Sequence, residues 1–179
     1  MGGGDKGLMA FGGATLLDAV IARLAPQAAP LALNAGGDPT RFSRFGLPVL
    51  VDPVPDQPGP LAGILAAMDW AAALGAARVL TVPCDAPFLP ADLVARLAAS
   101  DPARPAIAAT QGGTDHPVVG LWPVALAPLV RAALARGERR VGDLTRATGA
   151  LAVAFPPGPP DPFLNLNTPA DLRAAKGWL

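Results

Sequence analysis

The sequence is poor in the residues on which several common site chemistries depend. Its 179 residues include one cysteine, one histidine and no tyrosine. The single cysteine, Cys84, excludes an intrachain disulfide and a zinc site built from several cysteines. Only His116 could serve Cys84 as a base, and no motif pairs the two. We therefore exclude a cysteine enzyme and expect Cys84 to be a small buried residue. The lack of tyrosine excludes phenolic general acids.

Neither sign of charge is in excess, and no long apolar run is present. Fourteen basic residues balance fourteen acidic ones, which disfavours nucleic acid as a main partner. The longest stretch without a charged side chain, 116–130, contains two prolines, whereas about 20 apolar residues are needed to cross a bilayer. Residues 1–6 show no basic region leading into an apolar one, as a signal peptide would. We expect a cytoplasmic globular protein without a membrane segment.

The chain has the length of a single domain, residues 1–179, and alternates strand-like runs with helical stretches. A hydrophobic content of 51% is too high for a disordered chain. Helical periodicity places Leu16, Leu17, Val20, Ile21 and Leu24 on one face of a helix that Pro26 ends. Periodicity and end signals also predict helices at 61–74, 92–99, 124–136, 139–147 and from 168 onward. Apolar β-type runs predict strands at 31–33, 48–51, 78–82, 106–110, 118–121 and 151–155. This alternation predicts a doubly wound α/β domain with a mostly parallel sheet.

Polar residues follow three of the predicted strands. Asn34, Asp52 and Asp85 each stand at a strand end, and in such sheets ligands bind at the carboxyl ends of the strands. Asp85 lies between two prolines in the segment 82–87, which holds its carboxylate rigidly. Mg²⁺ typically takes one or two carboxylates together with substrate phosphates. Asp85 is therefore a candidate magnesium ligand; the alternative is that it only caps the following turn.

Two glycine-rich segments are candidates for nucleotide contacts. Gly2-Gly3-Gly4-Asp5-Lys6 offers backbone N–H groups and an ammonium to phosphates, although it is not a Walker loop. Pro58-Gly59-Pro60-Leu61-Ala62-Gly63 leads into a helix whose first N–H groups are unpaired. For each segment the alternative is structural: a terminus without a role for its glycines, or an ordinary helix entry.

Three further motifs are weaker. Asn165-Leu166-Asn167 places both amides on one side of an extended segment, unless Asn167 only caps the next helix. A lone histidine usually serves structure, so in Asp115-His116-Pro117 we expect no catalytic base. Glu138-Arg139-Arg140 is more often a solvated cluster than a site, although anionic substrates favour such arginines.

Together these residues resemble the molybdenum cofactor guanylyltransferases, in the family's order and from end to end of the chain. The matching pieces are Met1-Gly2-Gly3-Gly4-Asp5-Lys6, Asn34, Asp52, Pro58-Gly59-Pro60-Leu61-Ala62-Gly63, Pro83-Cys84-Asp85-Ala86-Pro87, Asp115-His116-Pro117, Gly137-Glu138-Arg139-Arg140 and Asn165-Leu166-Asn167-Thr168-Pro169. Each piece is weak alone, but together in register they are specific.

The resemblance implies a Rossmann-like nucleotidyltransferase, a three-layer sandwich, and a reaction in which GTP and the molybdopterin cofactor give the guanine dinucleotide cofactor and pyrophosphate. It implies that Lys6 contacts the GTP phosphates and Asp85 holds Mg²⁺, both as catalytic residues. Molybdoenzymes or their chaperones would receive the product.

The resemblance also assigns the binding residues. Asn34 and Asp52 would fix the nucleoside, with the 58–63 loop shaping the guanine pocket. Asn165 and Asn167 would face the pterin. The related cytidylyltransferases commonly have Asp-x-Asp at the last position, which favours GTP as the substrate here.

The start of the chain departs from the family pattern. The family opens with a β-strand, Leu-Ala-Gly-Gly and a basic stretch, directly before the segment that Met1 begins here. We expect that the natural protein is longer, because every downstream motif is intact. The alternatives are a non-catalytic remnant that binds pterin or a partner, and a nucleotidyltransferase of the same fold that uses CTP or makes a nucleotide sugar.

Overall fold

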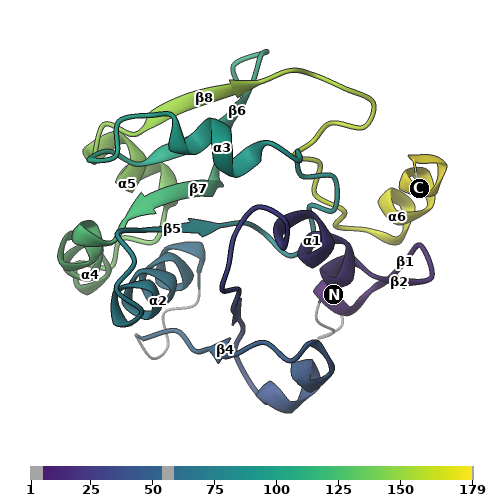
Figure 1. Ribbon diagram of the computed structural model, residues 1–179, viewed down its shortest axis with the longest axis horizontal. Coiled ribbons are helices and arrows are strands. Elements are labelled where there is room, and N and C mark those ends of the chain that lie inside the picture. Colours follow the sequence, from purple (N-terminus) through teal and green to yellow (C-terminus); the bar gives the residue numbers. More distant parts are fainter. Residues whose placement is uncertain (1–5, 54–58, 179) are drawn as a thin grey trace.

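Strands and helices alternate along the chain in the order that the sequence predicts (Figure 1). The computed structural model describes residues 6–53 and 59–178. Its α-helices are α1 (Leu16–Leu24), α2 (Pro60–Ala73), α3 (Leu93–Ala98), α4 (Ala127–Ala135), α5 (Val141–Ala147) and α6 (Pro169–Ala175). Its strands are β1 (Ala10–Phe11), β2 (Ala14–Thr15), β3 (Leu33–Asn34), β4 (Val49–Leu50), β5 (Arg78–Thr81), β6 (Ala106–Thr110), β7 (Asp115–Pro123) and β8 (Leu151–Phe155). Short 3-10 helices are η1 (Lys6–Leu8), η2 (Pro39–Phe45), η3 (Val124–Leu126) and η4 (Lys176–Trp178).

Most predicted elements are confirmed to within a few residues. The helix predicted at 124–136 is η3 followed by α4. β7 is longer than the predicted 118–121 because β5 and β6 pair with it along both edges. The prediction misses the β1–β2 hairpin, whose strands have two residues each, and η2.

The strands of the described ranges form a four-stranded sheet and two smaller pairs. The larger sheet has the order β5-β7-β6-β8, in which β7 runs antiparallel to both neighbours and β6 runs parallel to β8. β3 and β4 form a separate parallel pair. Strands β5, β6 and β8 therefore point one way and β7 points the other, so the mostly parallel direction is confirmed, with β7 as the exception.

Successive residues of the central strands face opposite sides and build two cores. Ile107 packs with buried residues of α2, α4 and α5. Its neighbours Ala106 and Ala108 pack with buried residues of α1 and α3. Strands buried on both faces and covered by helices on each form the predicted three layers.

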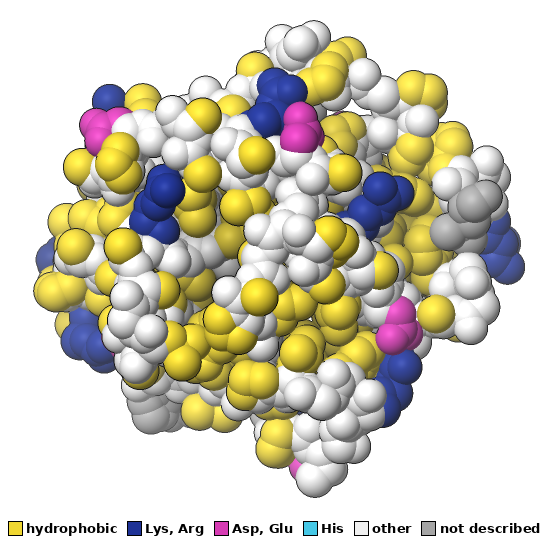
Figure 2. Space-filling model, viewed as in Figure 1, with side chains coloured by type: hydrophobic (Ala, Val, Ile, Leu, Met, Phe, Trp, Pro, Cys, Tyr) yellow, Lys and Arg dark blue, Asp and Glu magenta, His cyan; other side chains and the backbone are white. Residues whose placement is uncertain are grey.

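The exposed surface combines hydrophobic side chains with few charged ones. In Figure 2 hydrophobic side chains spread over much of the face in view, and lysines, arginines and acidic residues are scattered among them. No helix in the described part of the chain has the length and apolarity that crossing a membrane requires.

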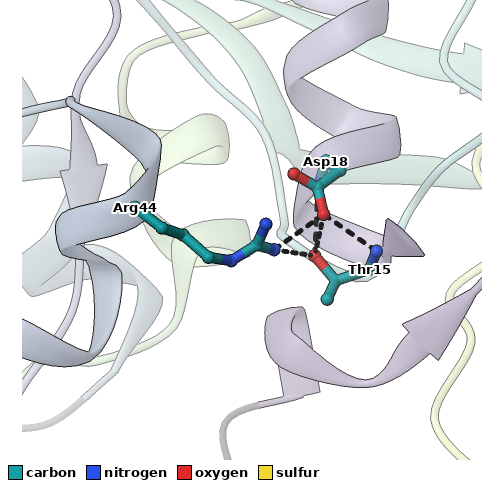
Figure 3. Close-up of polar contacts among 3 residues, drawn as sticks. All are labelled: Thr15, Asp18 and Arg44. Carbon is teal, nitrogen blue, oxygen red and sulfur yellow. Dashed lines mark hydrogen bonds and ion pairs between the residues drawn. The ribbon is translucent and has the colours of Figure 1, made fainter.

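Two helices begin at threonine caps, at opposite ends of the chain. Thr15 caps α1 in a reciprocal box with Asp18, and Thr168 caps α6 in the same way with Asp171. Arg44 of η2 also donates to the Thr15 hydroxyl and to the Asp18 carboxylate, at 2.9 and 2.7 Å (Figure 3). The α1 cap therefore also fixes η2 against α1.

Candidate functional site

Residues from the two ends of the chain and from the strand β5 meet at one point. The Lys6 ammonium donates to Asn167 Oδ1 at 2.7 Å and lies 3.9 Å from Asp85 Oδ2. Lys6 stands at the start of η1, and Asp85 follows β5 by four residues. A cation, a carboxylate and an amide thus share one site at the carboxyl end of β5, which we name the Lys6 cluster.

Asp85 is the buried charged residue of the described ranges, only 8% exposed. Burial raises the pKa of its carboxyl, and the nearby Lys6 ammonium offsets part of that rise. The side chain of Lys6 is half exposed, so its charge can reach a ligand from solution. A carboxylate that the fold buries despite the free-energy cost of its desolvation is a candidate functional group.

The segment that carries the two asparagines is anchored between them. Leu166 is fully buried, and its N–H donates to the Asp85 carbonyl at 2.9 Å. Burying a leucine side chain stabilises by about 1.5–3 kcal/mol. Asn165 and Asn167 on either side of it are exposed. Thr168 is the cap of α6, and the Asn167 side chain accepts from Lys6. Capping is therefore not the role of the Asn167 side chain.

A second cluster lies at the ends of β3 and β4. The Asn34 amide donates to Asp52 Oδ1 at 3.0 Å and to the Leu50 carbonyl at 3.3 Å. Gly63, in the first turn of α2, faces this amide: a Cβ at Gly63 would lie 2.5 Å from Asn34 Oδ1. We name these residues the Asn34 cluster; its geometry requires glycine at position 63.

A cavity of about 730 Å³ separates the two clusters. Lys6, Asn34, Gly63 and Cys84 are among the residues that line it. The expectation that Cys84 is buried is wrong: its side chain is exposed, because it faces this cavity rather than a packed core. Gly7, which no sequence motif marks, packs against Cys84: a Cβ at Gly7 would lie 3.3 Å from Cys84 Cβ. Partial desolvation of the sulfur within the cavity, and then the neighbouring Asp85 carboxylate, raise the pKa of the Cys84 thiol.

The structure divides the predicted strand-end residues rather than uniting them. Asn34 pairs with Asp52, whereas Asp85 joins Lys6 and Asn167. The sequence could not show this division, because the Asp85 partners come from the two ends of the chain. Residues 1–5 and 54–58, including Gly2–Asp5 and Pro58, lie outside the described residues.

Two of the three weaker motifs, those around His116 and Glu138, lie apart from these contacts. The ring of His116 stacks on Phe163 with centroids 4.8 Å apart, and its Nε2 is buried without a hydrogen-bond partner among the described residues. Glu138 pairs with Arg136 at 2.8 Å. Neither contact includes a residue of the two clusters.

The donor set suits a metal held mainly by its substrate. Within residues 6–53 and 59–178 no group of three or more histidine, cysteine or acidic side chains could hold an ion. Asp85 offers one carboxylate, which fits a Mg²⁺ that takes its other ligands from phosphates and water. A single carboxylate does not fit a cation whose ligands all come from protein side chains.

Comparisons with known proteins show the family to which the chain belongs. Residues 1–151 match the family described as MobA-like NTP transferase domain. The molybdenum cofactor guanylyltransferase of Nitrobacter hamburgensis is 49% identical over 98% of this chain and 87% of its own length. The protein of the same name from Rhodopseudomonas palustris is 50% identical over 98% of this chain and 86% of its own length. The one from Cereibacter sphaeroides is 47% identical over 100% of this chain and 90% of its own length.

Solved structures share the fold. Molybdopterin-guanine dinucleotide biosynthesis protein A from Archaeoglobus fulgidus has a TM-score of 0.76 at 19% identity and covers 98% of this chain and 91% of its own. The 2-C-methyl-D-erythritol 4-phosphate cytidylyltransferase of Thermus thermophilus has a TM-score of 0.68 at 20% identity, with coverage of 97% and 93%. The predicted nucleotidyltransferase fold is confirmed.

Proposed function

The chain belongs to the molybdenum cofactor guanylyltransferases, which transfer GMP from GTP to the molybdopterin cofactor and release pyrophosphate, and we propose that its two polar clusters divide this reaction between them. The Lys6 cluster handles the phosphates, and the Asn34 cluster holds the nucleoside. The relatives, at about 50% identity, carry the guanylyltransferase name, which favours GTP over the CTP and nucleotide-sugar alternatives.

The observation that carries the proposal is the pairing of Lys6 with the buried Asp85. A phosphate oxygen of the cofactor attacks the α-phosphorus of GTP, and the bond from that phosphorus to the bridging oxygen breaks as pyrophosphate leaves. Such a transfer needs positioning and charge stabilisation rather than a covalent intermediate. The half-exposed Lys6 ammonium supplies positive charge beside the phosphates. Asn167 holds that ammonium in place.

Asp85 is the residue that would hold Mg²⁺. When bound there, the ion would neutralise charge on the GTP phosphates. The carboxylate must be ionised for this, and in the chain without a bound ion burial raises its pKa. A cation near Asp85 would also offset the free-energy cost of burying the charged carboxylate.

The remaining residues position the two substrates. Asn34 and Asp52 present an amide and a carboxylate to the nucleoside, and the described part of the 58–63 loop brings Gly63 against Asn34. Asn165, exposed beside the Lys6 cluster, would contact the pterin together with Asn167. A cytoplasmic location and delivery of the product to molybdoenzymes or their chaperones stay predictions.

The test is the substitution Asp85→Asn, followed by pyrophosphate release from GTP, Mg²⁺ and molybdopterin cofactor. We expect turnover to fall by at least about 100-fold, since a charge essential to the reacting phosphates is lost. The matched control is Asp92→Asn, an exposed residue whose ion pair with Arg96 is worth little. Turnover within twofold of the parent chain in Asp85→Asn would refute the assigned role. Preference for CTP in the parent chain would refute the guanylyl proposal itself.

A further inference from the structure

The motif Asp115-His116-Pro117 has no role in the proposed reaction. His116 is the second residue of β7 and pairs with Ala108 of β6. Paired residues of antiparallel strands share one face of a sheet, and Ala108 belongs to the core that α1 and α3 cover. The imidazole of His116 therefore faces that core.

An irregularity of the sheet brings His116 to this place. Ile107 of β6 pairs with Gly120 of β7. The next residue, Ala108, pairs with His116, so the register shifts by three residues between them. In an unbroken register His116 would lie beyond the end of β6. Pro117, within the shifted stretch, has no N–H to give to a ladder. Bulges re-aim side chains and are common next to active sites.

The ring of His116 packs on Phe163. The two ring centroids are 4.8 Å apart, and the ring planes are inclined by 36°. Phe163 is buried, and its ring meets the ring of Phe155 edge-on, with centroids 5.2 Å apart. Both separations lie in the range of favourable aromatic contacts. His116 and Phe155 therefore both hold Phe163 in its place.

Phe163 begins the segment that reaches the Lys6 cluster. Asn165 follows it by two residues, and Leu166 then donates its N–H to the Asp85 carbonyl at 2.9 Å. The segment is thus attached to the rest of the fold at Phe163 on one side and at Leu166 on the other. Asn165 stands exposed between these attachments. A displacement of Phe163 would pass along this short stretch of backbone to Asn165.

His116 does not act as a base through its buried nitrogen. Nε2 is buried and has no hydrogen-bond partner among the residues that the structure describes. A general base must lie within hydrogen-bond reach of the proton that it takes, and a buried atom offers no such access. The interaction that the structure shows for His116 is instead the contact of its ring with Phe163. Phenylalanine would keep this contact without the unpaired nitrogen.

We propose that His116 is a positioning residue for the second substrate, because through Phe163 it sets the place of Asn165. This inference rests on the proposed function, which takes the pterin as the ligand of Asn165. It predicts that a change at His116 weakens binding of the molybdopterin cofactor and leaves binding of GTP unchanged. The Asn34 cluster, which holds the nucleoside, is built on β3, β4 and α2 and takes no part in the aromatic contact.

A double-substitution cycle in steady-state kinetics tests this path. In His116→Ala we expect the KM for the molybdopterin cofactor to rise roughly tenfold, less than the ~100-fold effect of a misplacement of about 1 Å. The KM for GTP and kcat should stay within about twofold of the parent values. Phe163→Leu should show the same pattern. The two substitutions together should cost no more than the larger single one, because both break one path. Additive effects would overturn the proposal.

Two variants separate positioning from a general loss of stability. His116→Phe keeps the ring, and we expect it to restore the KM of the parent chain for the molybdopterin cofactor. Val130→Ala removes buried packing from the core on the other face of the sheet and should leave both KM values unchanged. A KM in His116→Phe as high as in His116→Ala contradicts the proposal, because the imidazole nitrogens rather than the ring would then matter. Equal increases for both substrates in His116→Ala contradict it too.

Amide hydrogen exchange of the free protein gives a readout that does not need the reaction. We expect the Leu166 amide to exchange at least about tenfold faster in His116→Ala than in the parent chain, and at the parent rate in His116→Phe. Phe163→Leu carries the same test if His116→Ala does not fold. An unchanged Leu166 rate refutes the inference, whereas a parent chain that prefers CTP refutes the proposed function, so the two failures are distinguishable.

Discussion

Burial raises the pKa of the Asp85 carboxyl, which means that the fold disfavours the charged form of this group relative to the neutral one. The ionised Asp85 carboxylate therefore does not stabilise the fold, and Asp85→Asn, which removes its charge, should leave the Tm unchanged or raise it. The substitution thus separates function from stability, because lost turnover in a variant that folds as well as the parent chain is a chemical effect.

Gly63 offers a prediction on the nucleoside side of the site. In Gly63→Ala the new Cβ would lie 2.5 Å from Asn34 Oδ1, so the Asn34 amide must move away from Asp52. We expect the KM for GTP to rise by roughly 10- to 100-fold, in line with the effect of a misplacement of about 1 Å. The KM for the molybdopterin cofactor should change much less. Steady-state kinetics with each substrate varied in turn measures both.

The control for this substitution is Gly142→Ala, in α5, where a Cβ meets nothing within 4 Å. Alanine is the better helix former at both positions, so loss of helix cannot explain a difference between the variants. An unchanged KM for GTP in Gly63→Ala would remove Asn34 from the nucleoside site.

The identities of the site residues could be predicted from the sequence, but their partners could not. Lys6, Asp85 and Asn167 stand in recognisable motifs, and Leu166 is buried between two exposed asparagines, as alternation along an extended segment predicts. No local pattern indicates that Lys6 bonds Asn167, because the two residues are 161 positions apart in the sequence. Cys84 shows a different limit: its apolar character predicts burial, and only the tertiary structure reveals a cavity beside it.

At the scale of elements, the cap of α1 gives a pH-dependent prediction. Hydrogen bonds from Arg44 and Thr15 lower the pKa of Asp18 from 3.8 to about 2. A lowered folded-state pKa stabilises the protein above the unfolded value, and this stabilisation is lost as the pH falls from about 4 to about 2. We expect Asp18→Asn to lower the free energy of unfolding by about 1 kcal/mol at pH 7, discounted for solvent screening.

Urea unfolding of Asp18→Asn and the parent chain at pH 7, 4 and 2.5 checks this prediction. The difference between them should shrink toward the most acidic point. Asp143→Asn, which breaks an exposed pair with Arg146 on α5, is the control and should show a smaller difference at pH 7. A difference for Asp18→Asn that is constant with pH would show that its charge does not contribute.

Element positions could be predicted where a periodic apolar face or a cap marks them. α1 contains the predicted apolar face and ends two residues before Pro26, and α2 is shifted by one residue. The hairpin of β1 and β2 and the short η2 have no such signal, because a few residues cannot show a period. The extra length of β7 comes from its two partners, which supply hydrogen bonds beyond its apolar stretch.

At the scale of the whole molecule, the uneven strand pairing predicts unequal local stability. β6 pairs on both sides, with β7 and β8, whereas β3 and β4 pair over two residues and face the cavity. In amide hydrogen exchange of the 179-residue chain, we expect the amides of Leu33 and Ala35 to exchange at least about 100-fold faster than those of β6. Equal rates would show that both regions open only by global unfolding.

The bond from Lys6 to Asn167 joins residues 161 positions apart. During synthesis, at about 5–20 residues per second, the amino-terminal half of such a chain leaves the ribosome well before the end of α6 exists. The lysine is thus made well before its amide partner. A product of translation that stops before Asn167 lacks the side chain that holds the ammonium, so it cannot assemble this part of the site.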